Sequence, residues 1–139
     1  MAETLNDTFD NAIKRYQDGE SVDKLIPVFQ DICAQAPKMN SAWTCLAWLY
    51  LLDKQPENAV KAAERSIKID PYDAQARINL AMAMLEAKQK GVREHVEVAQ
   101  QLIDGAAEIR EQVAYSMADG LQRNPDWASL KQIKSWITV

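Results

Sequence analysis

Residues 41–52 read SAWTCLAWLYLL and carry no charged side chain. A helix that buries a single face needs an apolar residue only at every third or fourth position, whereas here both sides are apolar. The stretch is too short to cross a membrane, because a spanning helix needs roughly 20 apolar residues, and Asp53 and Lys54 end the run. A helix formed by these residues therefore needs a cover on both sides.

The chain as a whole has the composition of one helical domain. Its 139 residues can bury a single core, 26% of them are charged, and only four are glycine. No long stretch alternates apolar and polar residues as a strand does, so we expect an all-α fold. The stretch MAETLNDTFD lacks the basic start and apolar centre of a secretion signal. We therefore expect a cytoplasmic protein in which Cys33 and Cys45 are reduced thiols.

Charge and motifs argue against nucleic-acid binding, metal binding and catalysis. A net charge of −4 and a pI near 5.0 do not supply the clustered positive surface that phosphates require. His95 is the single histidine, and its neighbours Glu94 and Glu97 do not complete a metal-ligand spacing. The sequence has no glycine-rich phosphate loop and no nucleophile beside an activating group. We expect no enzymatic activity, no metal and no cofactor.

Several residues recur with a period of 34 positions. Pro37 and Pro71 are separated by this distance, as are Tyr16 and Tyr50. The second unit has the fullest pattern, which consists of Trp43, Leu46, Ala47, Tyr50, Ala59 and Pro71. Their order and spacing resemble the tetratricopeptide repeat, a pair of helices that stacks against its neighbours. The unit departs from that pattern by having alanine at positions 47 and 63, where the family has glycine and phenylalanine.

The resemblance implies a helical-hairpin solenoid of about three repeats and a capping helix, all within one domain. The expected segments are repeats at about 6–39, 40–73 and 74–109, with an insertion near 88–93, and C-terminal helices at about 110–139. The insertion either lengthens a loop or extends both helices. Gly19 is expected to end the first helix and Ser21 to cap the second.

The C-terminal part shows helical spacing over a long stretch. Apolar residues recur every three or four positions over about 92–122 without a proline, which favours one long helix over two shorter ones. Asn124 is then expected to cap a last helix that covers the final repeat, because terminal repeats otherwise expose their outer face.

The resemblance also implies a concave groove. In this family the first helix of each unit packs one stripe into the stack and lines the groove with its other side. The positions that would line the groove are Asp10, Lys14, Gln17, Thr44, Cys45, Trp48, Leu51, Leu52, Gln75, Ile78, Asn79, Met82 and Leu85. Such a groove would be charged in the first unit and largely apolar in the next two.

An apolar groove of this kind must be covered, because large apolar patches are unusual on monomers. One cover is a helix or an extended segment of another protein, as in an adaptor, a chaperone or a complex-assembly factor. The alternative is that the chain's own C-terminal helices, or a second copy in a homodimer, fill the groove. We favour the partner protein, and we then expect Trp48 to be partly exposed in the free chain.

Some co-chaperones of this family hold C-terminal carboxylates with a clamp of lysine, asparagine and arginine side chains. The corresponding positions here are Asp10, Lys14, Cys45, Gln75 and Asn79. Lys14 is the one cation of this set and the other four side chains are neutral or acidic, so the set lacks the several cations that charge-assisted hydrogen bonds to two carboxylates require. Acidic chaperone tails are therefore expected to bind no better than scrambled controls.

Overall fold

The computed structural model describes residues 4–139, which form eight α-helices and contain no strand. The helices are α1 (Leu5–Gln17), α2 (Val22–Gln35), α3 (Asn40–Leu52), α4 (Pro56–Ile69), α5 (Ala74–Glu86), α6 (Val92–Gly105), α7 (Ala107–Arg123) and α8 (Ala128–Trp136). Residues 1–3 of the acidic N-terminal stretch lie outside the described part. The expectation of an all-α fold is confirmed.

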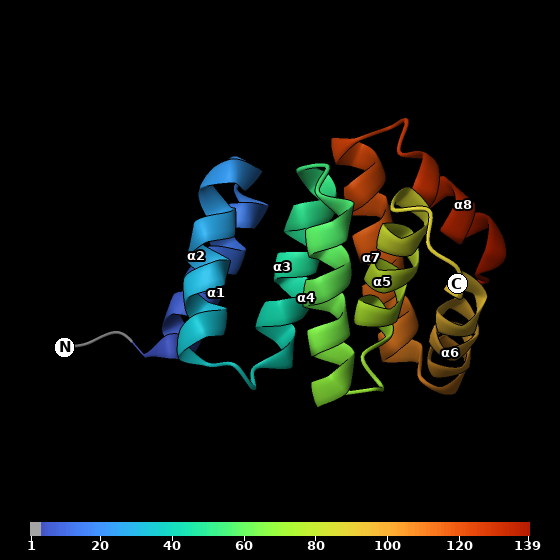
Figure 1. Ribbon diagram of the computed structural model, residues 1–139, viewed down its shortest axis with the longest axis horizontal. Helices are drawn as coiled ribbons and strands as arrows, with labels where there is room; N and C mark the ends of the chain where they lie inside the picture. Colours follow the sequence, from blue (N-terminus) through green and yellow to red (C-terminus); the bar gives the residue numbers. More distant parts are fainter. Residues whose placement is uncertain (1–3) are drawn as a thin grey trace.

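The first six helices form three antiparallel hairpins that stand side by side (Figure 1). Each hairpin packs on the next, with contacts between α2 and α3 and between α4 and α5. The helix α7 lies behind α5 in this view and contacts α5 and α6, and α8 lies at the far end of the array, where it contacts α5 as well as α7. Among residues 4–139, no helix combines the length and apolarity needed to cross a membrane.

The apolar run in α3 is explained by its neighbours. α3 packs against α2, α4 and α5, so its side chains are enclosed in several directions. Residues on both sides of the helix are buried, namely Ala42, Thr44, Leu46, Ala47, Trp48, Leu49 and Leu51. A helix that is apolar all round is a buried helix, and α3 therefore forms the centre of the core together with α5.

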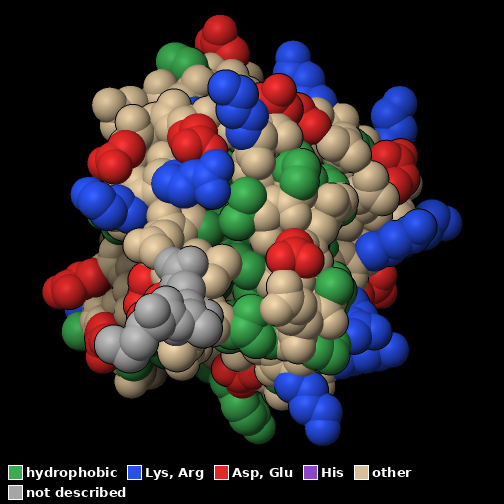
Figure 2. Space-filling view, turned by 90° about the vertical axis from the view of Figure 1, so that its left-hand side faces the viewer, with side chains coloured by type: hydrophobic (Ala, Val, Ile, Leu, Met, Phe, Trp, Pro, Cys, Tyr) green, Lys and Arg blue, Asp and Glu red, His purple; other side chains and the backbone are tan. Residues whose placement is uncertain are grey.

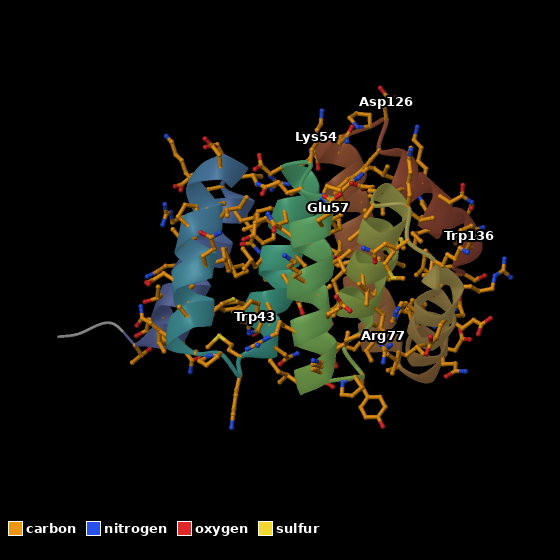
Figure 3. The ribbon with its side chains drawn as sticks, in the orientation of Figure 1. Trp43, Lys54, Glu57, Arg77, Asp126 and Trp136 are labelled. Carbon is orange, nitrogen blue, oxygen red and sulfur yellow. The ribbon has the colours of Figure 1, made fainter. Side chains whose placement is uncertain are left out.

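Trp43 belongs to the side of α3 that packs within the stack. Its Nε1 donates a hydrogen bond to the carbonyl of Pro37 at 3.0 Å, and the guanidinium of Arg65 lies 4.9 Å from the centre of its ring. Trp43 and Arg77 lie toward one end of the hairpins, whereas Lys54 and Asp126 lie at the opposite end (Figure 3). The side chain of Trp43 is therefore held by Pro37 and Arg65.

The single long helix expected over about 92–122 is wrong. α6 ends at Gly105, and α7 begins at Ala107 after one extended residue, Ala106, with φ −153° and ψ 119°. Glycine weakens a helix because its backbone loses more conformational freedom than that of other residues, and the break lets α7 take a new direction. The insertion lengthens a connection instead of the helices, because α4 and α6 both have 14 residues.

Two expected caps differ from the structure. Asn124 is the C-cap of α7, and α8 begins only at Ala128, with Trp127 at its N-cap position. Ser21 does occupy the N-cap position of α2, but its side chain makes no capping hydrogen bond. Gly19 follows the end of α1 with a φ of +90°, a conformation that glycine adopts without strain.

The α1–α2 end of the array carries a band of hydrophobic side chains that charged residues surround (Figure 2). Phe9 of α1 and Val22 of α2 are half-buried and pack against the core, and the rings of Phe9 and Phe29 meet edge to face with centroids 5.9 Å apart. These contacts connect the first hairpin to the common core.

Candidate functional site

A hollow of about 220 Å³ lies between α1, α3, α5 and α7. It is lined by Ile13, Tyr16, Gln17, Phe29, Thr44, Cys45, Trp48, Leu49, Gln75, Asn79, Tyr115, Ser116 and Asp119. The first helices of the three hairpins contribute most of these residues, as expected for a concave groove. Tyr115, Ser116 and Asp119 come from α7, which forms an additional wall.

The hollow has a polar floor on α3 and α5. Asn79 is fully buried and donates a hydrogen bond from Nδ2 to the carbonyl of Thr44 at 3.0 Å. Its Oδ1 accepts a hydrogen bond from Nε2 of Gln75 at 2.8 Å. The Thr44 hydroxyl donates to Asp73 at 2.7 Å, and Asp73 also caps α5. Gln75 Oε1 is buried and has no hydrogen-bond partner among residues 4–139.

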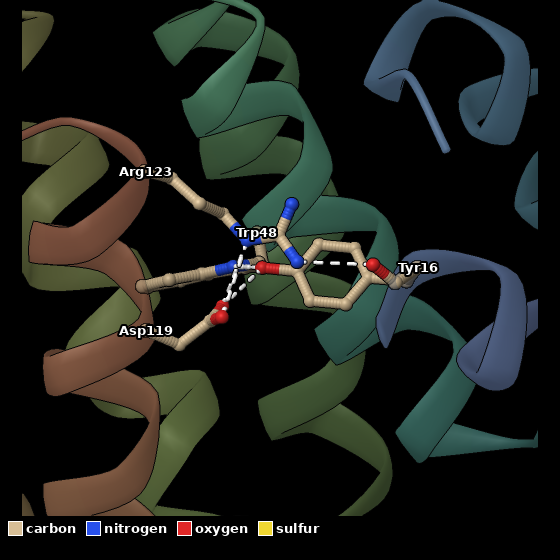
Figure 4. Close-up of polar contacts among 4 residues, drawn as sticks. All are labelled: Tyr16, Trp48, Asp119 and Arg123. Carbon is tan, nitrogen blue, oxygen red and sulfur yellow. Dashed lines mark hydrogen bonds and ion pairs between the residues drawn. The ribbon is translucent and has the colours of Figure 1, made fainter. Parts of the chain in front are cut away.

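Four side chains join α7 to α1 and α3, and we call this set the latch: Tyr16, Trp48, Asp119 and Arg123 (Figure 4). The Tyr16 hydroxyl donates to the carboxylate of Asp119 and accepts from Nε1 of Trp48 at 2.8 Å. Arg123 donates to the Tyr16 carbonyl at 3.0 Å and to Asp119 at 3.1 Å. Its guanidinium lies 3.8 Å from the centre of the Tyr16 ring.

Within the latch, the backbone of α7 at Gly120 approaches the ring of Trp48 very closely. A Cβ atom at Gly120 would lie 2.9 Å from Cη2 of Trp48 and 2.7 Å from Cδ2 of Leu130. The rings of Trp48 and Trp127 are 5.2 Å apart between centroids. Only 9% of the surface of Trp48 is exposed, so the expectation that it is partly exposed in the free chain is wrong. The C-terminal helices cover it, as the alternative interpretation had it.

Burial changes the acidity of Tyr16, Cys45 and Cys33, of which the first two line the hollow. Burial and the hydrogen bond to Asp119 raise the pKa of Tyr16 above its ordinary value. Burial raises the pKa of the Cys45 thiol to about 12 and that of Cys33 to about 12. Both cysteines are free and remain protonated at neutral pH, so neither supplies the thiolate that nucleophilic chemistry needs.

The positions predicted for the groove fall into three groups. Six of them line the hollow, namely Gln17, Thr44, Cys45, Trp48, Gln75 and Asn79. Asp10 and Lys14 are exposed on α1 outside it, and Lys14 lies 3.6 Å from Asp18 in an ion pair. Leu52 is half-buried, and Leu85 borders a separate shallow depression beside α8.

The remaining three positions require a correction. Leu51 is 2% exposed, and Ile78 and Met82 are fully buried. None of the three borders the hollow. Leu51 is enclosed because α3 packs against α2, α4 and α5. Ile78 and Met82 are enclosed because α5 is surrounded by α3, α4, α6, α7 and α8. A partner cannot contact these side chains in this structure.

Several lining residues were not predicted from the sequence. Ile13 and Tyr16 could have been found, because they lie one turn apart on α1 and Tyr16 shares the 34-residue period with Tyr50. Tyr115, Ser116 and Asp119 had no such signal, since nothing in their spacing shows that α7 forms a wall of the hollow or that Asp119 contacts Tyr16 of α1. The latch could therefore not be predicted.

His95 lies apart from the hollow and contacts Arg77. Its Nδ1 is 3.0 Å from Nη1 of Arg77. Burial, and then the positive charge of Arg77, lower the pKa of His95. Among residues 4–139, no three His, Cys, Asp or Glu side chains are grouped so that they could hold a metal ion.

The latch predicts a specific pH dependence for Tyr16→Phe. At pH 8 we expect the variant to be less stable by about 1–3 kcal/mol, because it lacks the hydroxyl of two hydrogen bonds. Tyr16 is an acid whose pKa is raised on folding. The unfolded chain therefore loses this proton near pH 10 while the folded chain keeps it, and the stability contributed by the hydroxyl falls as the pH rises further.

The measurement is urea unfolding at several pH values between neutral pH and about pH 11, above the ordinary tyrosine pKa. The stability difference between wild type and Tyr16→Phe should narrow above the ordinary pKa of tyrosine. Tyr72→Phe is the matched control, because Tyr72 is 73% exposed. A difference that stays constant with pH would contradict the role given to the hydroxyl.

Comparison with known proteins agrees with this architecture. The stack of hairpins places the chain in the class of helical-repeat proteins. Residues 40–83 match the family model of the tetratricopeptide repeat. The matched segment covers α3, α4 and most of α5, and the chain as a whole has the fold of tetratricopeptide repeat proteins. No curated protein sequence matches the chain closely enough to indicate a relative.

Solved structures with this fold include chaperones. The type III secretion translocator chaperone SycD of Yersinia enterocolitica has a TM-score of 0.71 at 19% identity, over 96% of this chain and 94% of that chain. SycD in complex with a peptide of the translocator YopD has a TM-score of 0.72 at 18% identity, over 96% and 95%. The TPR domain of Sgt2 from Aspergillus fumigatus has a TM-score of 0.63 at 19% identity, over 81% and 80%. At these identities the likeness shows the fold.

Proposed function

We propose that the chain is a non-enzymatic adaptor, chaperone or complex-assembly factor that binds a segment of a partner protein in its concave groove. The observation that carries this proposal is the hollow of about 220 Å³ between α1, α3, α5 and α7. Apolar side chains such as Ile13, Phe29 and Leu49 line it, so it can receive an apolar anchor side chain of a helix or an extended segment. The SycD structure that contains a YopD peptide supports the proposal by analogy of fold.

The residues that line the hollow indicate the charge and polarity of the partner segment. Lysine, arginine and histidine are absent from the residues of the described chain that line the hollow, and the carboxylate of Asp119 is already paired with Tyr16 and Arg123. An acidic segment would therefore find no cation, and an apolar, uncharged segment fits better.

A photoreactive amino acid placed at Gln17 tests the proposal. Gln17 is exposed on α1 and lines the hollow, so light should attach the partner at this position. The matched control is the same amino acid at Glu64, an exposed residue of α4 that does not line it. Mass spectrometry of the adducts identifies the partner. Ile13→Glu should abolish the adduct at position 17, because it places a charge in the apolar lining.

Equal adducts from both positions, or adducts unaffected by Ile13→Glu, would argue against a binding groove. An adduct of twice the chain's own mass would favour the alternative, in which a second copy fills the groove. Light scattering over a concentration series checks that outcome independently, because a homodimer dissociates on dilution.

A further inference from the structure

We infer that α7 covers the surface on which a helix of the partner binds, and that the partner binds by displacing α7. We call this surface, which is centred on Tyr16 and Trp48, the seat. This inference rests on the proposed function and specifies the segment that fits. Along α7, the buried residues are Val113, Met117 and Gly120. The fitting segment is thus an amphipathic helix with two apolar residues four positions apart and a small residue three positions further along.

The size of the hollow is the first reason. A volume of about 220 Å³ receives a side chain, whereas an α-helix with its side chains is about 10–12 Å across. α7 already packs beside α5, and its residues Asp119 and Gly120 lie against Tyr16 of α1 and Trp48 of α3. A second helix can therefore lie against Trp48 only if α7 leaves.

The weak attachment of α7 is the second reason. Only three of its 17 residues are buried, whereas α5 buries residues on all its sides. No side chain caps the N-terminus of α7, and the single extended residue Ala106 connects it to α6. Since apolar burial is the main source of stability, a partner helix with a wider apolar face would bind more strongly than α7 does.

The contacts of α7 define the complementary surface. Over Trp48 the seat admits only a small residue, because even a Cβ at position 120 would lie 2.9 Å from the indole. One position earlier, the Tyr16 hydroxyl donates to the carboxylate of Asp119. A fitting helix therefore carries a small residue over Trp48 with a hydrogen-bond acceptor directly before it.

The test weakens the attachment of α7 through substitutions on α7 itself, so that the residues of the seat are unchanged. In the full chain, Asp119→Ala combined with Arg123→Ala removes the α7 half of the latch while Tyr16 and Trp48 remain. The probe is a fluorescein-labelled peptide of residues 106–124, measured by fluorescence anisotropy. The matched control combines Arg110→Ala with Glu111→Ala, two exposed residues of α7.

We expect the probe to bind the latch variant about tenfold more tightly than wild type or the control, because apparent affinity scales with the fraction of molecules whose seat is open. Met117→Glu or Gly120→Leu in the probe should abolish binding. Hydrogen exchange should show faster exchange of the α7 amides in the latch variant. Asp119→Asn serves as the milder variant if the double substitution does not fold.

Equal affinity of the probe for the latch variant and the control would overturn the inference. So would an absence of binding in a variant whose α7 amides exchange rapidly. The two proposals fail separately: partner adducts at Gln17 with unchanged protection of α7 would leave the binding function standing and refute displacement.

Discussion

Replacing Trp48 with alanine is expected to lower the free energy of unfolding by about 3–5 kcal/mol. The indole is 9% exposed and lies against Trp127 and Gly120, and its Nε1 donates to Tyr16. Its removal leaves a cavity beneath α7 and deprives the Tyr16 hydroxyl of a donor. Urea unfolding followed by far-UV circular dichroism measures the loss.

Trp136→Ala is the matched control for this substitution. Trp136 lies on α8 at the outer end of the array and is 42% exposed (Figure 3). Its replacement should cost no more than about 1 kcal/mol, as is usual for surface positions. Similar losses for the two variants would mean that α7 does not cover Trp48 in solution.

Two glycines, Gly105 at the end of α6 and Gly120 within α7, are expected to change the stability in opposite directions when each is replaced with alanine. Gly120→Ala should destabilise the chain by about 1–3 kcal/mol, because the added methyl group overlaps Trp48 and Leu130 in a filled interior. Gly105→Ala meets no atom within 4 Å and should stabilise by up to about 1 kcal/mol through helix propensity. Thermal unfolding of both variants beside wild type shows whether each substitution raises or lowers the stability.

If Gly120→Ala were as stabilising as Gly105→Ala, helix propensity alone would govern both positions. The close approach of α7 to Trp48 would then be refuted. A shared destabilisation would instead indicate that the end of α6 needs glycine for its backbone.

The repeat architecture could be predicted because it is encoded locally. The spacing of Trp43, Leu46, Tyr50 and Pro71 reports contacts between helices adjacent in sequence, and these contacts form as expected. The break at Ala106 was harder to predict, because the apolar spacing continues through it and only the neighbouring Gly105 hints at a weak point.

The candidate site was predictable only on its repeat side. Thr44, Cys45 and Asn79 line the hollow as expected, because their direction follows from helical geometry once the packing stripe is known. The wall formed by α7 depends on contacts between residues more than a hundred positions apart, such as Tyr16 and Asp119. Periodicity carries no information on such contacts. For the same reason the burial of Trp48 was missed.

The latch also bears on how the chain unfolds. In an open repeat array each unit touches only its neighbours, so end units can fray while the middle stays folded. Here Tyr16 and Asp119, 103 positions apart in sequence, connect the first hairpin to α7. Melting of either end breaks this connection and removes support from the other. We therefore expect the array to lose its structure in one cooperative transition, with the same midpoint for probes at both termini.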